Sequence, residues 1–152
     1  MHTVNLDDEV LPQLVLARVH RFLAGEAAAV QFVIRSEVKV DAPLVFLEEV
    51  FPRGLVVDCE ASEWPGTKLL HGVARVLKFD LDDGQSRSAV GVVHPWEWIH
   101  PTMPEDPAFF RSDGTLLSGC CSHEKFMTLT LREPEWVRIL GEIPELAHVA
   151  GE

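Results

Sequence analysis

The sequence lacks the features of a secreted or membrane-embedded chain. No stretch approaches the ~18 apolar residues that a transmembrane helix requires. The segment from Met1 to Glu9 carries no basic region followed by an apolar one, as a secretory signal would. Only three cysteines are present, Cys59, Cys120 and Cys121, and the two adjacent ones are poorly placed to bridge each other. We therefore expect a reducing compartment and a cytoplasmic location, with no membrane partner.

Basic residues are also scarce. Lys and Arg number 13 against 24 Asp and Glu, which gives a net charge of −11. No run of basic residues interleaved with aromatics offers a track for phosphates, so we expect no nucleic-acid partner. Hydrophobic residues, by contrast, make up 47% of the 152 residues, a composition typical of a packed globule. The length suits one domain, and we expect residues 1–152 to form it.

Motifs with a built-in mechanism are missing as well. The chain has no glycine-rich phosphate loop, no G-x-S-x-G elbow and no H-E-x-x-H helix. What the sequence does contain is a clear pattern of apolar spacing. Helical spacing covers residues 9–24 and 133–148, with Pro144 expected to bend or split the second helix. A two-residue alternation predicts strands within residues 28–40, 55–62, 67–81, 86–94, 116–121 and 123–132.

Turn residues suggest how these strands connect. Asp83-Gly84 predicts a long hairpin that joins residues 67–81 to residues 86–94, and Ser112-Asp113-Gly114 predicts a second one. Residues 44–51 suit either a short strand or a helix. The fold class is therefore α+β, mainly an antiparallel sheet or small open barrel of about six or seven strands, with an N-terminal and a C-terminal helix.

The long hairpin suggests a metal site. If Asp83-Gly84 is its loop, His71 and His94 become diagonal neighbours on the apolar face, with Cβ atoms roughly 7–8 Å apart. Cys121 and His123, two residues apart near the second hairpin, could add ligands. Zinc is the metal that such a set would favour, with Glu97 or Glu124 as an acid or base. The alternative is that His71, His94, Cys120 and Cys121 are ordinary core or rim residues.

A cysteine nucleophile is a further alternative. Cys121 and His123 would face the same way on a strand, and Asp58 or Glu60 could orient the histidine as a base. Inert buried cysteines are more common than activated ones, which weighs against this interpretation.

The segment Trp96-Glu97-Trp98-Ile99-His100 predicts a recognition surface, because tryptophans on a proline-stiffened loop offer a large apolar area. Its alternative is that Trp96 and Trp98 close the end of the core. The first functional hypothesis is therefore a cytosolic binding domain that recognises a protein partner or a small apolar ligand through Trp96, Trp98, His100 and one sheet face. The same surfaces could join two copies into a homodimer. The second hypothesis is a small metal-dependent hydrolase, and a third is a ligand-binding barrel or thioesterase-like fold.

Overall fold

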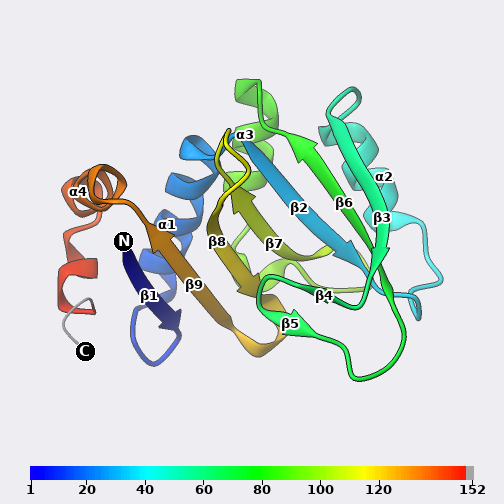
Figure 1. The fold of residues 1–152 in the computed structure, drawn as a ribbon, viewed down its shortest axis with the longest axis horizontal. Helices are drawn as coiled ribbons and strands as arrows, with labels where there is room; N and C mark the ends of the chain where they lie inside the picture. Colours follow the sequence, from blue (N-terminus) through cyan, green and yellow to red (C-terminus); the bar gives the residue numbers. More distant parts are fainter. Residues whose placement is uncertain (150–152) are drawn as a thin grey trace.

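The computed structural model describes residues 1–149 and confirms the α+β class, with an open antiparallel sheet rather than a closed barrel. Seven strands form the main sheet in the order β1-β9-β8-β7-β2-β6-β3 (Figure 1). These strands are β1 His2–Asp7, β2 Ala29–Ile34, β3 Leu55–Ala61, β6 Ala74–Asp80, β7 Glu105–Phe110, β8 Leu116–Cys121 and β9 Phe126–Leu131. A separate small hairpin pairs β4 Glu63–Trp64 with β5 Thr67–Lys68.

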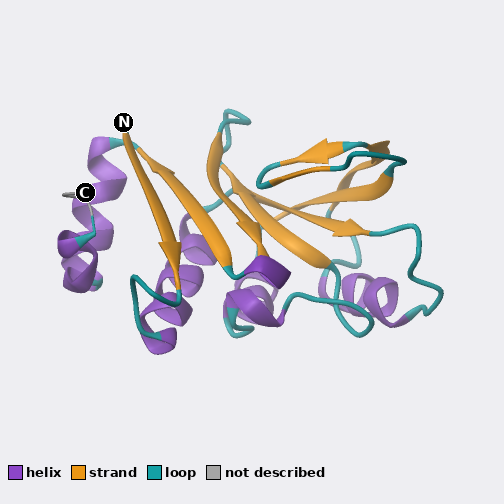
Figure 2. Cartoon of the chain, turned by 90° about the horizontal axis from the view of Figure 1, so that it is seen from below, coloured by secondary structure: helices purple, strands orange, loops and turns teal. Residues whose placement is uncertain are grey.

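Helices cover one face of this sheet, and the β4–β5 hairpin lies over the other (Figure 2). The α-helices are α1 Gln13–Glu26, α2 Ala42–Val50, α3 Gly84–Gly91 and α4 Glu133–Glu142, and the short 3₁₀-helices are η1 Pro95–Glu97, η2 Ser122–Glu124 and η3 Pro144–His148. Helices α1, α2 and α3 pack on the covered face, and α4 lies beside the β1 end. Among the described residues, no helix is both long enough and apolar enough to cross a membrane.

The main core lies between the sheet and the helices. Alternate strand residues such as Phe32 and Phe109 point toward the helices, and Leu16 and Leu23 of α1 meet them at the helical spacing that the sequence predicts. A smaller cluster lies on the opposite face under the hairpin and consists of Val33, Trp64, Ala74 and Val76. Both faces of the sheet centre are therefore buried, although only one carries helices.

The predicted hairpin between residues 67–81 and 86–94 is wrong. Asp83 does not form a tight turn but caps α3, because its carboxylate accepts a hydrogen bond from Ser86 N at 2.7 Å. Gly91 then allows α3 to approach α1 closely, since a Cβ there would lie 3.4 Å from Ala24 Cβ. Strand β6 pairs with β2 and β3 instead. The Asp-Gly pair that is typical of hairpins also suits a helix start, and tertiary packing on α1 selects the helix.

The other predictions fare better. Residues 44–50 belong to a helix, α2, with Pro43 in its first turn and Phe51 as its C-cap. The turn at residues 112–114 joins β7 to β8 as predicted, with Gly114 at φ +82. Pro144 ends α4 and begins η3, so the C-terminal helix is split. Strand β1 was not predicted; it pairs with β9 and buries Val4 and Leu6.

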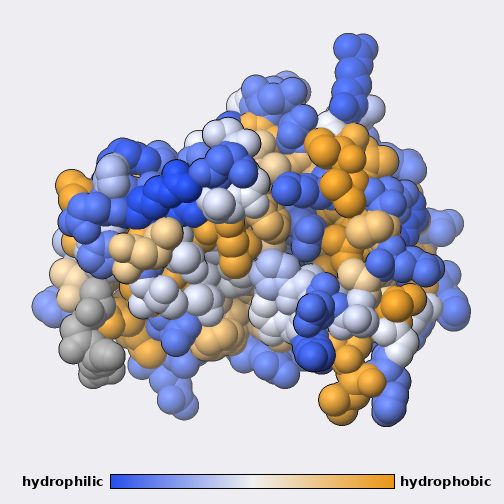
Figure 3. Space-filling model, viewed as in Figure 1, coloured by the Kyte–Doolittle hydropathy of each residue, from blue (hydrophilic) through white to orange (hydrophobic). Residues whose placement is uncertain are grey.

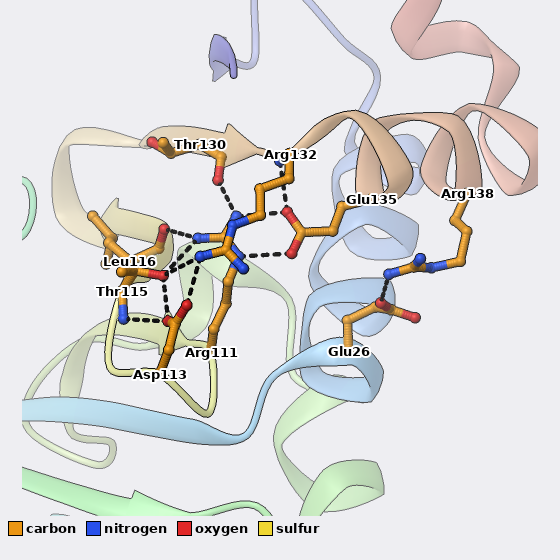
Figure 4. A network of polar contacts seen from close by, with 9 residues as sticks. All are labelled: Glu26, Arg111, Asp113, Thr115, Leu116, Thr130, Arg132, Glu135 and Arg138. Atoms are coloured by element: carbon orange, nitrogen blue, oxygen red, sulfur yellow. Dashed lines mark hydrogen bonds and ion pairs between the residues drawn. The ribbon is translucent and has the colours of Figure 1, made fainter.

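A network around Arg111 ties α4 to the sheet (Figure 4). The Arg111 guanidinium donates to both carboxylate oxygens of Glu135, at 2.6 and 2.5 Å, and to the backbone oxygens of Leu116 and Thr130, each at 2.6 Å. Both charged side chains are largely buried. This hydrogen bonding holds the pKa of Glu135 below its usual value. The bidentate geometry therefore fixes the start of α4 against β8 and β9.

Candidate metal centre

Because the predicted long hairpin is not formed, His71 and His94 lie in two different segments of the chain. His94 precedes η1, where its Nδ1 accepts a hydrogen bond from Trp96 N at 3.1 Å. Its Nε2 therefore carries the proton and donates to Gln13 O at 3.1 Å. His71 lies exposed in the loop between β5 and β6. The predicted pairing of these histidines across a hairpin is thus wrong, and both nitrogens of His94 already have backbone partners.

The tryptophans of the predicted recognition loop face inward. Trp98 is 0% exposed and Trp96 is 7% exposed, so both close the core as the alternative interpretation expects. Trp96 Nε1 donates to Asp8 Oδ1 at 2.6 Å, and Trp98 packs on Phe32. These indole rings do not offer the surface that a partner would need, and the recognition surface predicted for them is not present in this structure.

Cys121 and His123, by contrast, lie together and meet a third ligand that the sequence did not suggest. One ligand atom each from Asp106, Cys121 and His123 lie within 4.8 Å of one another. Cys121 Sγ is 3.7 Å from His123 Nδ1. In residues 1–149, this is the one group of three such residues found at metal-binding spacing. Carboxylate, thiolate and imidazole are all zinc ligands.

Local backbone geometry explains why these three side chains converge. Cys121 ends β8 on the hairpin face, because its neighbour Cys120 points into the helix-side core. The chain then tightens into η2 and leaves it at Lys125 with φ 54, which keeps His123 close to the strand end. Asp106 adopts φ 52 in β7, beside an irregularity in the pairing with β2. A non-glycine residue in this region is uncommon and is often found at functional sites.

Asp106 is completely buried but fully hydrogen-bonded. Its Oδ2 accepts from Trp64 Nε1 at 2.9 Å and from Thr67 Oγ1 at 3.4 Å, and its Oδ1 accepts from Ser122 N at 3.0 Å. Burial raises the pKa of this carboxyl, and these hydrogen bonds oppose the rise. The donors come from the hairpin and from η2, so they orient the carboxylate toward the other two ligands.

The other two ligands also have outer contacts. Thr67 Oγ1 lies 3.6 Å from Cys121 Sγ, and Glu124 Oε1 lies 3.8 Å from His123 Nε2. A histidine that binds a metal through Nδ1 usually presents its other nitrogen to a carboxylate or carbonyl, and Glu124 is the carboxylate near His123 Nε2, although at 3.8 Å it is beyond hydrogen-bond distance. Cys121 is only 2% exposed, whereas the His123 side chain is 44% exposed. The centre is therefore open to solvent only on its histidine side.

The same geometry disfavours a cysteine nucleophile. Burial raises the pKa of the Cys121 thiol, whereas a nucleophilic cysteine needs a lowered one. The carboxylates proposed to orient the histidine lie elsewhere: Asp58 and Glu60 are on β3, at the far edge of the sheet, and Asp58 binds Arg75. Asp106 makes its hydrogen bonds to Trp64, Thr67 and Ser122 rather than to His123. A bound cation would supply the positive charge that a thiolate needs.

A buried ion cluster adjoins the centre. Arg35 Nε donates to Glu105 Oε2 at 2.5 Å, and His100 Nδ1 lies 3.3 Å from the other oxygen of Glu105. The Arg35 guanidinium also lies over the Trp64 ring at 5.8 Å, and Trp64 in turn holds Asp106. Burial lowers the pKa of His100. His100 thus belongs to a charged cluster next to the ligands rather than to an exposed binding loop.

The β4–β5 hairpin acts as a cover for the centre. Its turn presses on β8, because a Cβ added at Gly119 would lie 2.9 Å from Pro65 Cβ. Gly66 adopts φ +93 over the backbone of Cys120. Glycine at position 119 therefore lets the hairpin approach closely enough for Thr67 to reach Cys121 and Asp106.

The sequence offered a signal for two of the three ligands. Cys121 and His123 are two residues apart, which the alternation of strands made visible. Asp106 lies in the proline-rich segment before the second hairpin, one of 24 acidic residues, and nothing in its local spacing distinguishes it.

Comparison with known protein families, with curated proteins and with solved structures found no match to this chain.

Proposed function

We propose that this protein binds one zinc ion through Asp106, Cys121 and His123 and acts as a small metal-dependent hydrolase. The observation that supports the proposal is the convergence of three different zinc-preferring ligand atoms within 4.8 Å. Three protein ligands leave the fourth tetrahedral position for water, as in catalytic zinc sites. Because zinc–ligand bonds are about 2.0–2.3 Å long, the three ligand atoms must come closer to one another than 4.8 Å when zinc binds. The exposed His123 ring is the member that can rotate to close the set.

The surroundings support the same proposal. Two ligands have outer hydrogen-bond partners: Trp64 and Ser122 for Asp106, and Thr67 for Cys121. Such partners hold ligands in a fixed orientation. A zinc-bound water has a pKa of about 7, so it can act as a nucleophile at neutral pH. Glu124 lies 3.8 Å from the solvent-facing His123, and we assign it the role of acid or base.

The first test is metal content. Protein prepared in zinc-containing buffer should retain close to one equivalent of zinc by elemental mass spectrometry. Cys121→Ser and His123→Gln should lose most of it. The matched controls are Cys59→Ser and His71→Gln, which remove the same chemical groups at exposed positions away from the site. A cobalt-loaded sample should show thiolate-to-metal absorption that vanishes in Cys121→Ser.

Wild-type protein without zinc would contradict metal binding, and retention of zinc by Cys121→Ser, or equal loss in the Cys59→Ser control, would contradict binding at this site. Hydrolysis is tested next with an activated ester and a phosphodiester. Turnover that needs zinc and falls in Glu124→Gln without loss of metal supports the enzyme. Full zinc occupancy without turnover of either probe would contradict the hydrolase and leave a structural zinc site. Such a site would stabilise the fold by about 2.7 kcal/mol when the free zinc concentration is 100 times the Kd.

A further inference from the structure

A second feature lies at the opposite edge of the sheet from β1. Strand β3 is the last in the sheet order and, among the residues that the structure describes, pairs with β6 alone. Its register is irregular between Leu55 and Val57 and continuous from there to Ala61. The outer side of this stretch therefore presents unpaired backbone amide and carbonyl groups, which form a template for another strand.

This edge has a register irregularity and two acidic residues, but it lacks two of the commonest protections of an edge strand. Between Leu55 and Ala61 there is no lysine and no proline, the residues that most often block edge pairing. Its first residues are exposed and apolar: Leu55 is 53%, Val56 55% and Val57 38% accessible. Figure 3 shows apolar atoms gathered over the start of β3. At this end, the strand therefore has an unpaired backbone edge and exposed apolar side chains.

An apolar cavity opens beside the same end. It has a volume of about 340 Å³ and lies between α2 and the β3–β6 pair. Its lining residues include Leu44, Leu47, Phe51, Leu55, Leu77 and Phe79. A strand that adds to a sheet edge gains affinity from backbone hydrogen bonds and specificity from pockets that take alternate side chains. The cavity is placed to take one apolar side chain of such a strand.

Charge decides which strand fits. Asp58 and Glu60 are exposed along β3, and Glu48 lies at the rim of the cavity. Arg75 of β6 donates to both carboxylate oxygens of Asp58, so three carboxylates surround one guanidinium and the side remains acidic. Pairing with a second copy would set these carboxylates against their own kind, between two chains of net charge −11 each. Asp58 and Glu60 pair in register with Leu77 and Arg75, so they share the cavity side of the sheet. A partner with basic residues on that side is complementary.

We propose that the β3 edge and this cavity bind an extended segment of another protein, whose residues on the cavity side are Lys or Arg opposite Asp58 and Glu60 and one apolar residue at the cavity. The segment adds an eighth strand to the sheet. Its basic side chains face Asp58 and Glu60, and an apolar side chain enters the cavity beside Leu55. This site is independent of Asp106, Cys121 and His123, so it can stand whether or not zinc binds.

The test uses the full chain and a synthetic peptide slightly longer than β3. The peptide carries valines on one face and, on the other face, lysines followed by one leucine at the position of the cavity. Titration calorimetry should show binding with a Kd below about 1 mM. The same peptide N-methylated at alternate amides keeps its charge but cannot pair fully, and should bind at least about tenfold more weakly. Hydrogen exchange should slow for amides in residues 55–61 when the unmodified peptide is added.

Val56→Lys should weaken the peptide by at least about tenfold, whereas Val137→Lys, a similarly exposed valine on α4, should leave binding unchanged. Equal binding of the N-methylated peptide would overturn the proposal, because it would reduce the interaction to charge attraction. Absence of binding up to about 1 mM would overturn it too. A dimer in sedimentation that Val56→Lys abolishes would assign the edge to a second copy and likewise refute it.

Discussion

His20 is a buried histidine whose replacement should change how the stability of the protein depends on pH. It lies on α1 with 0% exposure. Its Nε2 is 3.1 Å from Val90 O and 3.3 Å from Trp98 Nε1, and its Nδ1 has no hydrogen-bond partner within residues 1–149. A doubly protonated ring would leave Nδ1–H without an acceptor and would oppose the Trp98 N–H. Burial, aided slightly by His94, lowers the pKa of His20 to about 4.

Proton linkage gives the direction in which His20 changes the free energy of unfolding with pH. Between its unfolded pKa of about 6.5 and its folded pKa of about 4, His20 binds a proton in the unfolded state but not in the folded one. Stability from this group is complete above about pH 6.5 and is lost as the pH falls toward 4. Between about pH 7.5 and about pH 5 the loss is about 2 kcal/mol. That is a large part of the 5–15 kcal/mol that typically separates folded from unfolded domains, as an order of magnitude.

The perturbation is His20→Gln, whose amide can still donate to Val90 O but does not titrate. Urea unfolding followed by circular dichroism at several pH values gives the free energy of unfolding of both proteins. The variant is expected to start about 1 kcal/mol less stable near neutral pH and to lose about 2 kcal/mol less on acidification. Other groups, such as His100, titrate in both proteins, so their contributions cancel in the difference.

His20→Phe serves as a second variant, because it packs against Trp98 and Phe109 without any ionisable group. Its absolute stability can differ from that of His20→Gln, but the two should lose stability along the same shallower course. If either variant follows the wild-type pH dependence in parallel, the buried ring is not what acidification acts on, and the reasoning from burial to pKa fails.

Two further predictions concern the capping of α3 and the cover of the metal centre. Asp83→Ala should destabilise the protein by about 1 kcal/mol through loss of the N-cap, whereas Asp82→Ala should leave the denaturation midpoint nearly unchanged; equal effects would argue against the cap. Gly119→Ala should cost about 1–3 kcal/mol in thermal unfolding, because the new Cβ meets Pro65 at 2.9 Å. A stability equal to wild type would show that the hairpin does not press on β8.

Local patterns accounted for much of the secondary structure. The apolar spacing of α1, the alternation in β2, β3 and β8, and the glycine turn at Gly114 are all local, so the residues that produce them are visible in the chain. The error at residues 86–94 has a physical reason. Asp-Gly favours both a tight turn and a helix start, and the choice depends on whether Gly91 meets α1, which lies far away in the sequence.

In the candidate metal site, too, local sequence accounts for some of the ligands and tertiary structure for the other. Cys121 and His123 are close in the chain, so their proximity follows from local structure. Asp106 joins them because β7 and β8 pair and because Trp64 and Ser122 hold its carboxylate. For Trp98 the sequence left both a surface position and a core position open, and the packing of Phe32 against it places it in the core.

By itself, the sequence determined the class of this protein: an acidic α+β chain whose end helices and strands β2, β3, β6, β8 and β9 follow from periodicities that extend only a few residues. Tertiary structure alone decided which strands are neighbours, which edge is left open at β3, and which side chains of distant segments share a site. Those outcomes depend on the packing of segments far apart in the chain, and no local spacing encodes them.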